Sequence, residues 1–261
     1  MIVDCHTHYV SRAYAHLRAG SLVDSMDAYG VDHAVVFTLD GFFEDVRRHN
    51  DELAGFVAAH PGRLTAFATV YPRDAGAADE IRRAVTELGM KGVKLHPWLQ
   101  GFSPLEAYME PVARACAELG VPLISHDGTP PYSTPLQLGL LAERHPDLTV
   151  ILGHSGLLQL WPEALAAARR NRNVWLCLCG PPTSALQKLV DGVSHDRIVY
   201  GSDTGFGHDY QARHRLEQVR TLDLPDDSLN RILGENAVRL LGLPTPAARP
   251  ATRTHREIPS A

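Results

Sequence analysis

Short apolar runs alternate along this chain with longer stretches in which apolar residues recur at helical spacing. The short runs are rich in Val, Ile, Leu and Thr, which is typical of strands that are buried on both faces. The predicted strands are residues 2–8, 33–39, 64–71, 92–97, 121–127, 149–155, 174–180 and 197–203.

Amphipathic stretches of helical period lie between these runs, and several end at Gly or before Pro, where helices usually stop. The clearest are residues 42–60, 77–89, 105–120, 135–146, 159–171 and 209–222. Units of one strand and one helix recur about every 25 to 30 residues, which indicates βαβ repeats and a parallel sheet. Eight such units predict an α/β fold, a single-domain (β/α)8 TIM barrel. The alternative is a doubly wound open sheet, but no G-x-G-x-x-G motif follows any predicted strand.

The end of the chain differs in composition from the rest. Residues 226–242 have the pattern of a further helical segment. From Pro244 onward the chain is rich in Pro, Ala, Thr and Arg and has no periodicity, as flexible tails do. We therefore expect a barrel domain over residues 1–243 and a flexible C-terminal tail over residues 244–261.

Composition and charge exclude several classes of protein. The chain has 261 residues, 44% of them hydrophobic and 21% charged, with a formal net charge of −5. This acidic balance does not match the basic footprint of nucleic-acid binders. No apolar run approaches the roughly 18 residues that cross a bilayer. The 4 cysteines are too few for a disulfide scaffold. We expect a soluble cytoplasmic protein with reduced cysteines, no nucleic-acid partner and no membrane partner.

The opening stretch DCHTH places two histidines two residues apart within the first predicted strand. Residues i and i+2 of a strand point to the same face, so Asp4, His6 and His8 are expected on one side of it. Two imidazoles on one face can share a metal ion. They can also be two ordinary polar residues at a strand end, because a short H-x-H pair is a permissive pattern.

The positions of the other histidines favour the metal site. Of 14 histidines, five fall at the C-terminal ends of predicted strands, where the active site of a barrel is built. Asp203 ends the eighth strand, and Lys94 lies inside the fourth. The five histidines are His6, His8, His96, His126 and His154.

The ordered motifs HTH, GVKLHP, ISHDG, LGHSG and YGSD resemble the amidohydrolase superfamily. More narrowly, the chain resembles the amidohydrolase-related (family 2) metal-dependent hydrolases and decarboxylases. The segment ILGENAVRLLGL is similar to the helix that closes their barrels. The resemblance covers nearly all of residues 1–243.

This resemblance implies a set of metal ligands, made up of His6, His8, His126 and Asp203. It also implies that His154 is a catalytic or ligand-like histidine. The metal of the family is usually Zn²⁺, with Mn²⁺ possible, and we expect one ion per chain. Many relatives have proline two residues after the last ligand, whereas this chain reads DTG over residues 203–205.

The residue types fit this chemistry. Neutral imidazoles and a carboxylate suit Zn²⁺, which lowers the pKa of a bound water to about 7. Asp203 can accept the proton of that water and pass it to a leaving group, and His154 can polarise a carbonyl or stabilise an oxyanion. Lys94 is a further catalytic candidate. A carboxylated Lys94 would bridge two metals, whereas an unmodified Lys94 would pair with Asp203 or a substrate carboxylate. We favour the unmodified lysine and a mononuclear site.

The substrate-binding candidates are His96, Trp98, Tyr9 and Asp127. Trp98 can line the pocket wall or belong to the core. Tyr9 and Asp127, with Arg12 and His208, are expected on loops at the mouth. Cys177 and Cys179 form a C-x-C pair that we interpret as two small core residues.

The first interpretation of the function is a hydrolase that cleaves an ester, lactone or amide bond of a small, carboxylated molecule. The alternative is a metal-dependent, non-oxidative decarboxylase of an aromatic or unsaturated acid. A non-catalytic binding barrel is the remaining class, but such a protein would be expected to lack a ligand position. The resemblance also implies a homodimer.

Overall fold

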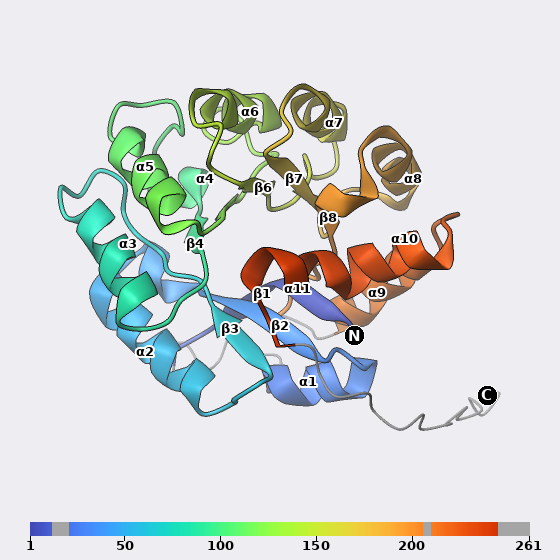
Figure 1. Ribbon diagram of the computed structural model, residues 1–261, viewed down its shortest axis with the longest axis horizontal. Coiled ribbons are helices and arrows are strands. Elements are labelled where there is room, and N and C mark those ends of the chain that lie inside the picture. The colour runs from blue at the N-terminus through green and yellow to red at the C-terminus, as the bar shows by residue number, and fades with distance from the viewer. Residues whose placement is uncertain (12–20, 206–209, 245–261) are drawn as a thin grey trace.

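The computed structural model describes residues 1–11, 21–205 and 210–244, in which eight parallel strands alternate with helices (Figure 1). The strands are β1 (Val3–Tyr9), β2 (His33–Thr38), β3 (Leu64–Ala66), β4 (Val93–Leu95), β5 (Leu123–Ser125), β6 (Val150–Leu152), β7 (Val174–Cys177) and β8 (Ile198–Val199). The longer helices are α1 (Leu22–Tyr29), α2 (Val46–Ala58), α3 (Ala77–Thr86), α5 (Met109–Leu119), α6 (Pro135–Arg144), α7 (Trp161–Arg170), α8 (Thr183–Gly192) and α9 (Tyr210–Arg220). The shorter helical segments are η2 (Asp40–Phe42), α4 (Pro97–Gln100), η3 (His195–Arg197), α10 (Asp226–Asn230), η4 (Arg231–Glu235) and α11 (Asn236–Leu241).

The strands form a barrel through backbone bonds at two seams. Strands β1 to β3 form one parallel sheet, and strands β4 to β8 form the other. The first seam joins the segment after β3 to β4, where Lys94 N–H donates to the carbonyl of Ala68 at 2.7 Å. The second joins β1 to the segment after β8, where Cys5 N–H donates to the carbonyl of Tyr200 at 2.9 Å. The predicted single-domain (β/α)8 barrel is therefore confirmed.

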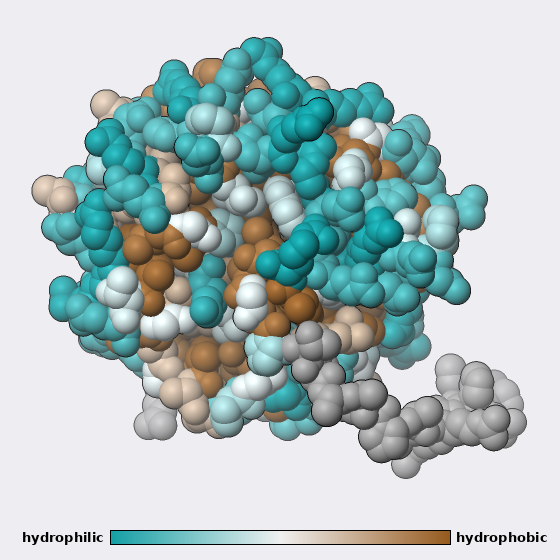
Figure 2. Space-filling view, in the orientation of Figure 1, coloured by the Kyte–Doolittle hydropathy of each residue, from teal (hydrophilic) through white to brown (hydrophobic). Residues whose placement is uncertain are grey.

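Apolar side chains form one layer inside the barrel and another between the strands and the helices. Helix α11 crosses one end of the barrel, and its residues Ala237 and Leu241 pack with the inner layer (Figure 1). Figure 2 shows this end of the molecule, with hydrophilic residues over the outer helices and hydrophobic ones mainly toward the centre and between helices. The C-terminal ends of the strands lie at the opposite end of the barrel, and the polar residues of the candidate site gather there. The inner layer includes Val3, Cys5, Val35, Phe37, Phe67, Ile124, Ile151, Cys177, Cys179 and Val199.

Local signals explain where individual helices begin and end. In α6 the hydroxyl of Thr134 and the side chain of Gln137 form a capping box, and Pro135 occupies the first turn. Helices α1 and α8 are not among the predicted stretches. Helix α1 has only 8 residues, but Ser21 caps its start and Gly30, with a φ of 73°, ends it.

Apart from β1, the predicted strands are longer than the observed ones and end one to five residues beyond the observed C-terminal ends. The further helical segment predicted over residues 226–242 is present as α10, η4 and α11. The predicted tail, apart from its first residue, lies outside the described residues and stays a prediction. Among the helices of the described residues, none combines the length and the apolar character that a membrane crossing requires.

A register shift in β1 changes one expectation about the opening strand. It lies between Asp4 and Thr7, opposite β2. Asp4 pairs with Ala34, which packs toward the outer helices, whereas His8 pairs with Phe37, which packs inside the barrel. The expectation that Asp4 shares a face with the two histidines is therefore wrong, because the shift interrupts the alternation of the strand.

Asp4 stabilises the second seam, which leads to a prediction about folding. Its Oδ1 accepts the N–H of His6 at 3.1 Å and of Ser202 at 3.0 Å, and its side chain is buried. Burial raises the pKa of Asp4 to about 7. We expect Asp4→Ala to lower the free energy of unfolding by about 2–4 kcal/mol, because two buried N–H groups lose their acceptor. Urea denaturation measures this change. Asp4→Asn keeps a carbonyl oxygen and should lose clearly less, so equal losses would contradict this role.

Candidate metal centre

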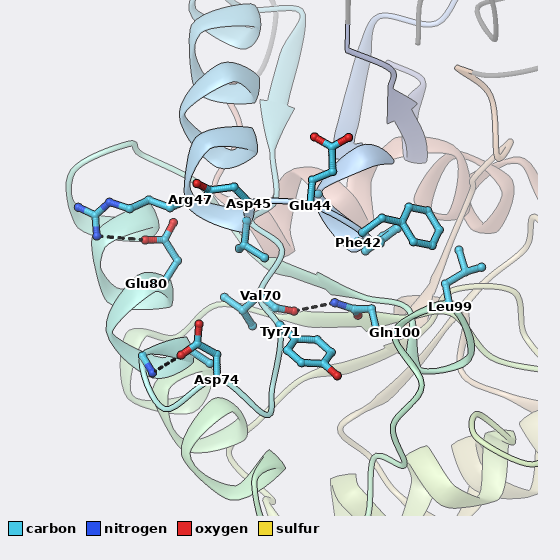
Figure 3. A pocket seen from close by; sticks show the side chains of 15 residues that line it. Phe42, Glu44, Asp45, Arg47, Val70, Tyr71, Asp74, Glu80, Leu99 and Gln100 are labelled. Carbon is cyan, nitrogen blue, oxygen red and sulfur yellow. Dashed lines mark hydrogen bonds and ion pairs between the residues drawn. The ribbon is translucent and has the colours of Figure 1, made fainter. Parts of the chain in front are cut away.

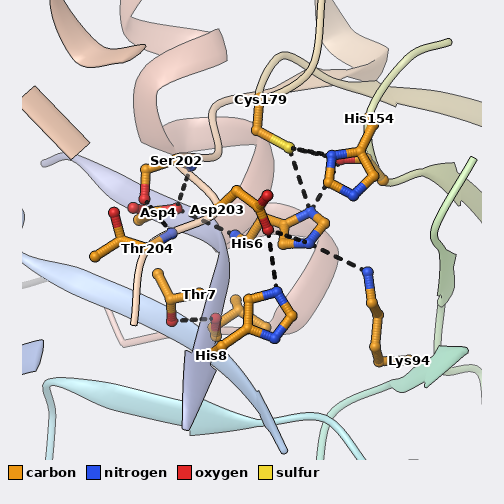
Figure 4. Close-up of polar contacts among 12 residues, drawn as sticks. Asp4, His6, Thr7, His8, Lys94, His154, Cys179, Ser202, Asp203 and Thr204 are labelled. Atoms are coloured by element: carbon orange, nitrogen blue, oxygen red, sulfur yellow. Dashed lines mark hydrogen bonds and ion pairs between the residues drawn. The ribbon is translucent and has the colours of Figure 1, made fainter. Parts of the chain in front are cut away.

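Three potential ligand atoms converge where β1 meets the segment after β8 (Figure 4). Oδ1 of Asp203 lies 3.3 Å from Nε2 of His6 and 3.1 Å from Nε2 of His8. Both histidines are buried, while the Asp203 side chain is 22% exposed. Two imidazole nitrogens and a carboxylate oxygen thus face one point that solvent reaches from the Asp203 side.

The backbone around Asp203 is shaped to hold its side chain there. Its φ is +63°, in the left-handed region that non-glycine residues rarely occupy. Its N–H donates to the carbonyl of His6 at 2.8 Å, and His8 N–H donates to the carbonyl of Thr204 at 2.7 Å. Gly205 has a φ of +120°, and a Cβ there would collide with the carbonyl of His8. Proline, with φ fixed near −65°, does not fit this backbone, which accounts for glycine at this position.

The charge states of the three groups suit a metal. Burial lowers the pKa of His6 and of His8, so both rings favour the neutral form that binds metal. Burial alone would raise the pKa of Asp203. Nearby His154, the hydrogen bond from His8 and the charge of Lys94 outweigh it and lower that pKa to about 2. The carboxylate is therefore ionised at neutral pH.

Lys94 lies beneath this group and is fully buried. Its Nζ is 3.2 Å from Nε2 of His6 and 5.1 Å from the centre of the Phe37 ring. Burial lowers the pKa of Lys94, although the charge of Asp203 opposes that effect. The expected direct ion pair with Asp203 is not formed between these described residues, because the partner of Lys94 is His6.

The remaining strand-end histidines form a row of rings that starts at His6. The centre of the His154 ring lies 4.7 Å from that of His6 and 4.5 Å from that of His126. His126 in turn stacks on His96 at 3.8 Å with a 12° tilt. Nε2 of His126 contacts the hydroxyl of Thr129 at 2.7 Å, and His126 is not in the ligand group that includes Asp203. Its role as a ligand stays a prediction.

Burial dominates the electrostatics of this row too. It lowers the pKa of His96 to about 2 and that of His126 further still, with the charge of Lys94 adding to both shifts. The neutral, stacked rings of His96 and His126 therefore form an aromatic wall beside His154.

Asp127 lies on the loop after β5, as the sequence predicts, but its side chain does not reach the mouth. It is fully buried. Its two carboxylate oxygens accept the N–H groups of His154 and Gly156, each at 2.6 Å. Burial raises the pKa of Asp127 to about 7, which these hydrogen bonds oppose. Asp127 holds the backbone around His154 in place. Because its carboxylate is buried in these contacts, it does not face a substrate.

The other residues that the sequence predicts at the mouth or the pocket wall differ in their surroundings. The hydroxyl of Tyr9 donates to Glu52 at 3.2 Å, on the side of α2. Trp98 is 49% exposed on α4, so it is not a core aromatic residue. Arg12 and His208 lie outside the described residues.

A cavity of about 650 Å³ lies between η2, the start of α2, the loop after β3, the start of α3 and α4, and none of the ligand group lines it (Figure 3). Phe42 lines it and meets the ring of His96 nearly edge-on, with centres 5.5 Å apart. Gln100 donates to the carbonyl of Val70 at 2.9 Å on the same wall. Phe42 thus stands between this cavity and the histidine row. A smaller cavity of about 120 Å³ is lined by His8 and Gly205.

Comparison with known proteins identifies the family of this chain. The sequence model of the family Amidohydro_2, described as amidohydrolase, matches residues 3–243. The chain belongs to this amidohydrolase family. It is therefore an enzyme of a metal-dependent family, as the resemblance implies.

Solved structures share the fold of this amidohydrolase at low identity. The 5-carboxyvanillate decarboxylase of Sphingomonas paucimobilis has a TM-score of 0.75 and 19% identity over 93% of this chain and 99% of its own. The 2,6-dihydroxybenzoate decarboxylase from Rhizobium has a TM-score of 0.74 and 19% identity over 93% and 98%. The dihydroxybenzoic acid decarboxylase of Polaromonas sp. JS666, with the same TM-score and identity, covers 93% and 97% and was solved with manganese and the inhibitor 2-nitroresorcinol.

The donor set of the amidohydrolase fits one divalent ion. Nδ1 of His6 lies 2.9 Å from the carbonyl of Gly153 and donates to it, which leaves the lone pair of Nε2 facing Asp203. Outer hydrogen bonds of this kind orient metal-binding histidines in general. A second group within the described residues, made of His6, Cys177 and Cys179, lies on the Nδ1 side of the ring. Because Gly153 already occupies that nitrogen, the Nε2 side is the better metal site.

Metal analysis tests this assignment. We expect protein purified without chelator to contain about one Mn²⁺ or Zn²⁺ per chain, and a His6→Ala, His8→Ala double variant to lose it, because half or more of the ligands are gone. Inductively coupled plasma mass spectrometry gives the stoichiometry. A His60→Ala, His145→Ala double variant, altered at helix ends, is the matched control and should keep the metal. Two tightly bound ions per chain would instead favour a binuclear site with carboxylated Lys94.

Proposed function

We propose that this enzyme is a metal-dependent decarboxylase of a small, hydroxylated aromatic acid. The observation that carries the proposal is the composition of the site. An ionised carboxylate and two neutral imidazoles lie beside a buried lysine and a wall of stacked histidine rings. Structures of the same fold include decarboxylases of hydroxybenzoates, one of them with bound manganese. These likenesses support the decarboxylase over the hydrolase that we put first from the sequence.

The metal-binding role falls to His6, His8, Asp203 and His126. The first three already face one point, and a turn of the His126 side chain would bring a fourth donor from the neighbouring ring row. When bound, a divalent cation supplies positive charge that attracts the carboxylate and the adjacent hydroxyl of the substrate. We infer Mn²⁺ or Zn²⁺, since nitrogen and oxygen donors suit both.

The reaction needs a proton but no oxidant. The bond between the ring and its carboxylate breaks, CO₂ leaves, and the electron pair that stays on the ring carbon must receive a proton. Asp203 is our candidate for its delivery, because it is the most accessible member of the ligand group. Because its pKa is about 2 and it is ionised at neutral pH, Asp203 must first accept a proton, from water or from the hydroxyl of the substrate, before it passes that proton to the ring carbon. His154, next to His6 in the row, is the second proton carrier.

The substrate would lie against groups that match an aromatic acid. The stacked rings of His96 and His126 offer a flat surface to an aromatic ring, and Trp98 on α4 can extend it. Lys94 adds positive charge below the carboxylate. We assign substrate contact to His96 and Trp98, whereas Tyr9 has its hydroxyl engaged by Glu52.

Hydrolysis of an ester, lactone or amide is the second candidate. The ionised Asp203 favours it as well, because a carboxylate beside a metal can accept a proton from water. The two reactions share the ligand set and differ in whether CO₂ is released.

A panel of hydroxybenzoates separates the two candidates. We expect the Mn²⁺-loaded protein to release CO₂ from at least one 2-hydroxy- or 2,6-dihydroxybenzoate, measured by a coupled carboxylase assay. Asp203→Asn should lower kcat by about 10²–10⁴-fold, because the proton carrier and one ligand are lost. Asp196→Asn, at the opposite end of β8, is the matched control. Cleavage of aryl esters or lactones without CO₂ release from any acid would favour the hydrolase.

A further inference from the structure

Cys179 contacts the candidate metal centre, although β7 supplies none of its predicted ligands. The residue is 1% exposed and follows the end of β7. Its Sγ lies 2.8 Å from the carbonyl oxygen of Gly153, 3.2 Å from Nδ1 of His154 and 3.4 Å from Nδ1 of His6 (Figure 4). A merely space-filling thiol does not need three polar neighbours at such distances.

The short contact with Gly153 decides where the thiol proton lies. A thiol has one hydrogen, and a carbonyl oxygen can only accept, so Cys179 donates to Gly153. The sulfur is then left as an acceptor for the ring of His154. Nδ1 of His154 must therefore carry the hydrogen, and its Nε2 keeps an unprotonated lone pair.

The same carbonyl orients His6. Gly153 accepts from Nδ1 of His6 at 2.9 Å as well as from the thiol, so one oxygen anchors two donors. Space for this arrangement is tight, since a Cβ at position 153 would fall 3.2 Å from Cε1 of His6 and clash with the carbonyl of Ser125. Cys179 and Gly153 together determine which nitrogen of each histidine faces the site.

We propose that Cys179 is a positioning residue that fixes His154 as the Nδ1–H tautomer and, with the Gly153 carbonyl, keeps Nε2 of both His154 and His6 unprotonated. In the resting protein, Nε2 of His154 is then available to accept a proton or to bind a metal ion. It is not the N–H donor to a carbonyl or oxyanion that the sequence suggests. The tautomer is a property of the metal-free protein, whereas its effect on metal binding rests on the proposed metal centre.

Nuclear magnetic resonance reads the tautomer without any assay of activity. Long-range ¹H–¹⁵N correlation spectra of histidine-labelled, metal-free protein near pH 8 distinguish Nδ1–H from Nε2–H rings. Assignment uses His154→Gln. We expect the Nδ1–H pattern for His154 in the wild type and a rise of the Nε2–H form in Cys179→Ala. A wild-type His154 with the hydrogen on Nε2 would overturn the proposal, even if Cys179→Ala does not fold.

Metal affinity gives the second readout. The Kd for Mn²⁺, measured by titration calorimetry, should rise about 10–100-fold in Cys179→Ala, as expected when an outer partner of a ligand is lost. Cys179→Ser, which keeps a donor and an acceptor, should recover part of that affinity. Cys116→Ala removes a fully buried thiol of α5 and is the matched control for lost packing. Cys179→Ala with the control's Kd and an unchanged His154 tautomer would reduce Cys179 to a core residue.

These readouts keep the two proposals separate. If Cys179→Ala shifts the tautomer and weakens Mn²⁺ binding while no hydroxybenzoate is decarboxylated, the positioning role stands and the proposed reaction fails. If CO₂ is released at the wild-type rate by Cys179→Ala and the tautomer is unchanged, the proposed reaction stands and the positioning role fails.

Discussion

The second seam of the barrel, where the segment after β8 bonds to β1, is the constraint on which the candidate metal centre depends. The N–H of Asp203 donates to the carbonyl of His6, and the N–H of His8 donates to that of Thr204. These backbone bonds join residues almost 200 positions apart and put a carboxylate between two imidazoles. The ligand group therefore forms only because the barrel closes between β8 and β1. An open sheet with the same sequence motifs would leave the carboxylate and the histidines on opposite edges.

Burial sets the protonation states of these groups. Removing imidazoles from water disfavours their charged forms, while the surrounding histidines and Lys94 keep Asp203 ionised. Neutral nitrogen donors and a charged oxygen donor thus coexist within hydrogen-bond distance. The cost of burying the carboxylate is offset by its neighbours, and those neighbours gain an acceptor that also holds them in place.

Much of the fold could be predicted because it depends on local pattern. The order of βα units and the convergence of His6, His8 and Asp203 follow from the spacing of apolar runs and from the resemblance. The rest depends on contacts between distant segments. The shift in β1 is set by its partner strand, and Asp127 turns inward because two N–H groups about thirty positions later need an acceptor. Cys177 and Cys179 look alike in sequence, yet only Cys179 reaches the ring of His154.

The charge balance of the site argues for an anionic substrate. A divalent ion held by His6, His8 and Asp203 would meet one formal negative charge, so the proposed site would be positive whether or not Lys94 carries a proton. A buried positive site attracts a carboxylate more strongly than a neutral ester or amide, since charge interactions strengthen away from water. A ring acid with a neighbouring hydroxyl supplies two oxygens on one face and a flat surface for the histidine wall. Decarboxylation would leave the negative charge on the ring carbon until a proton neutralises it, and a positive site would then hold the uncharged products less tightly than the carboxylate substrate.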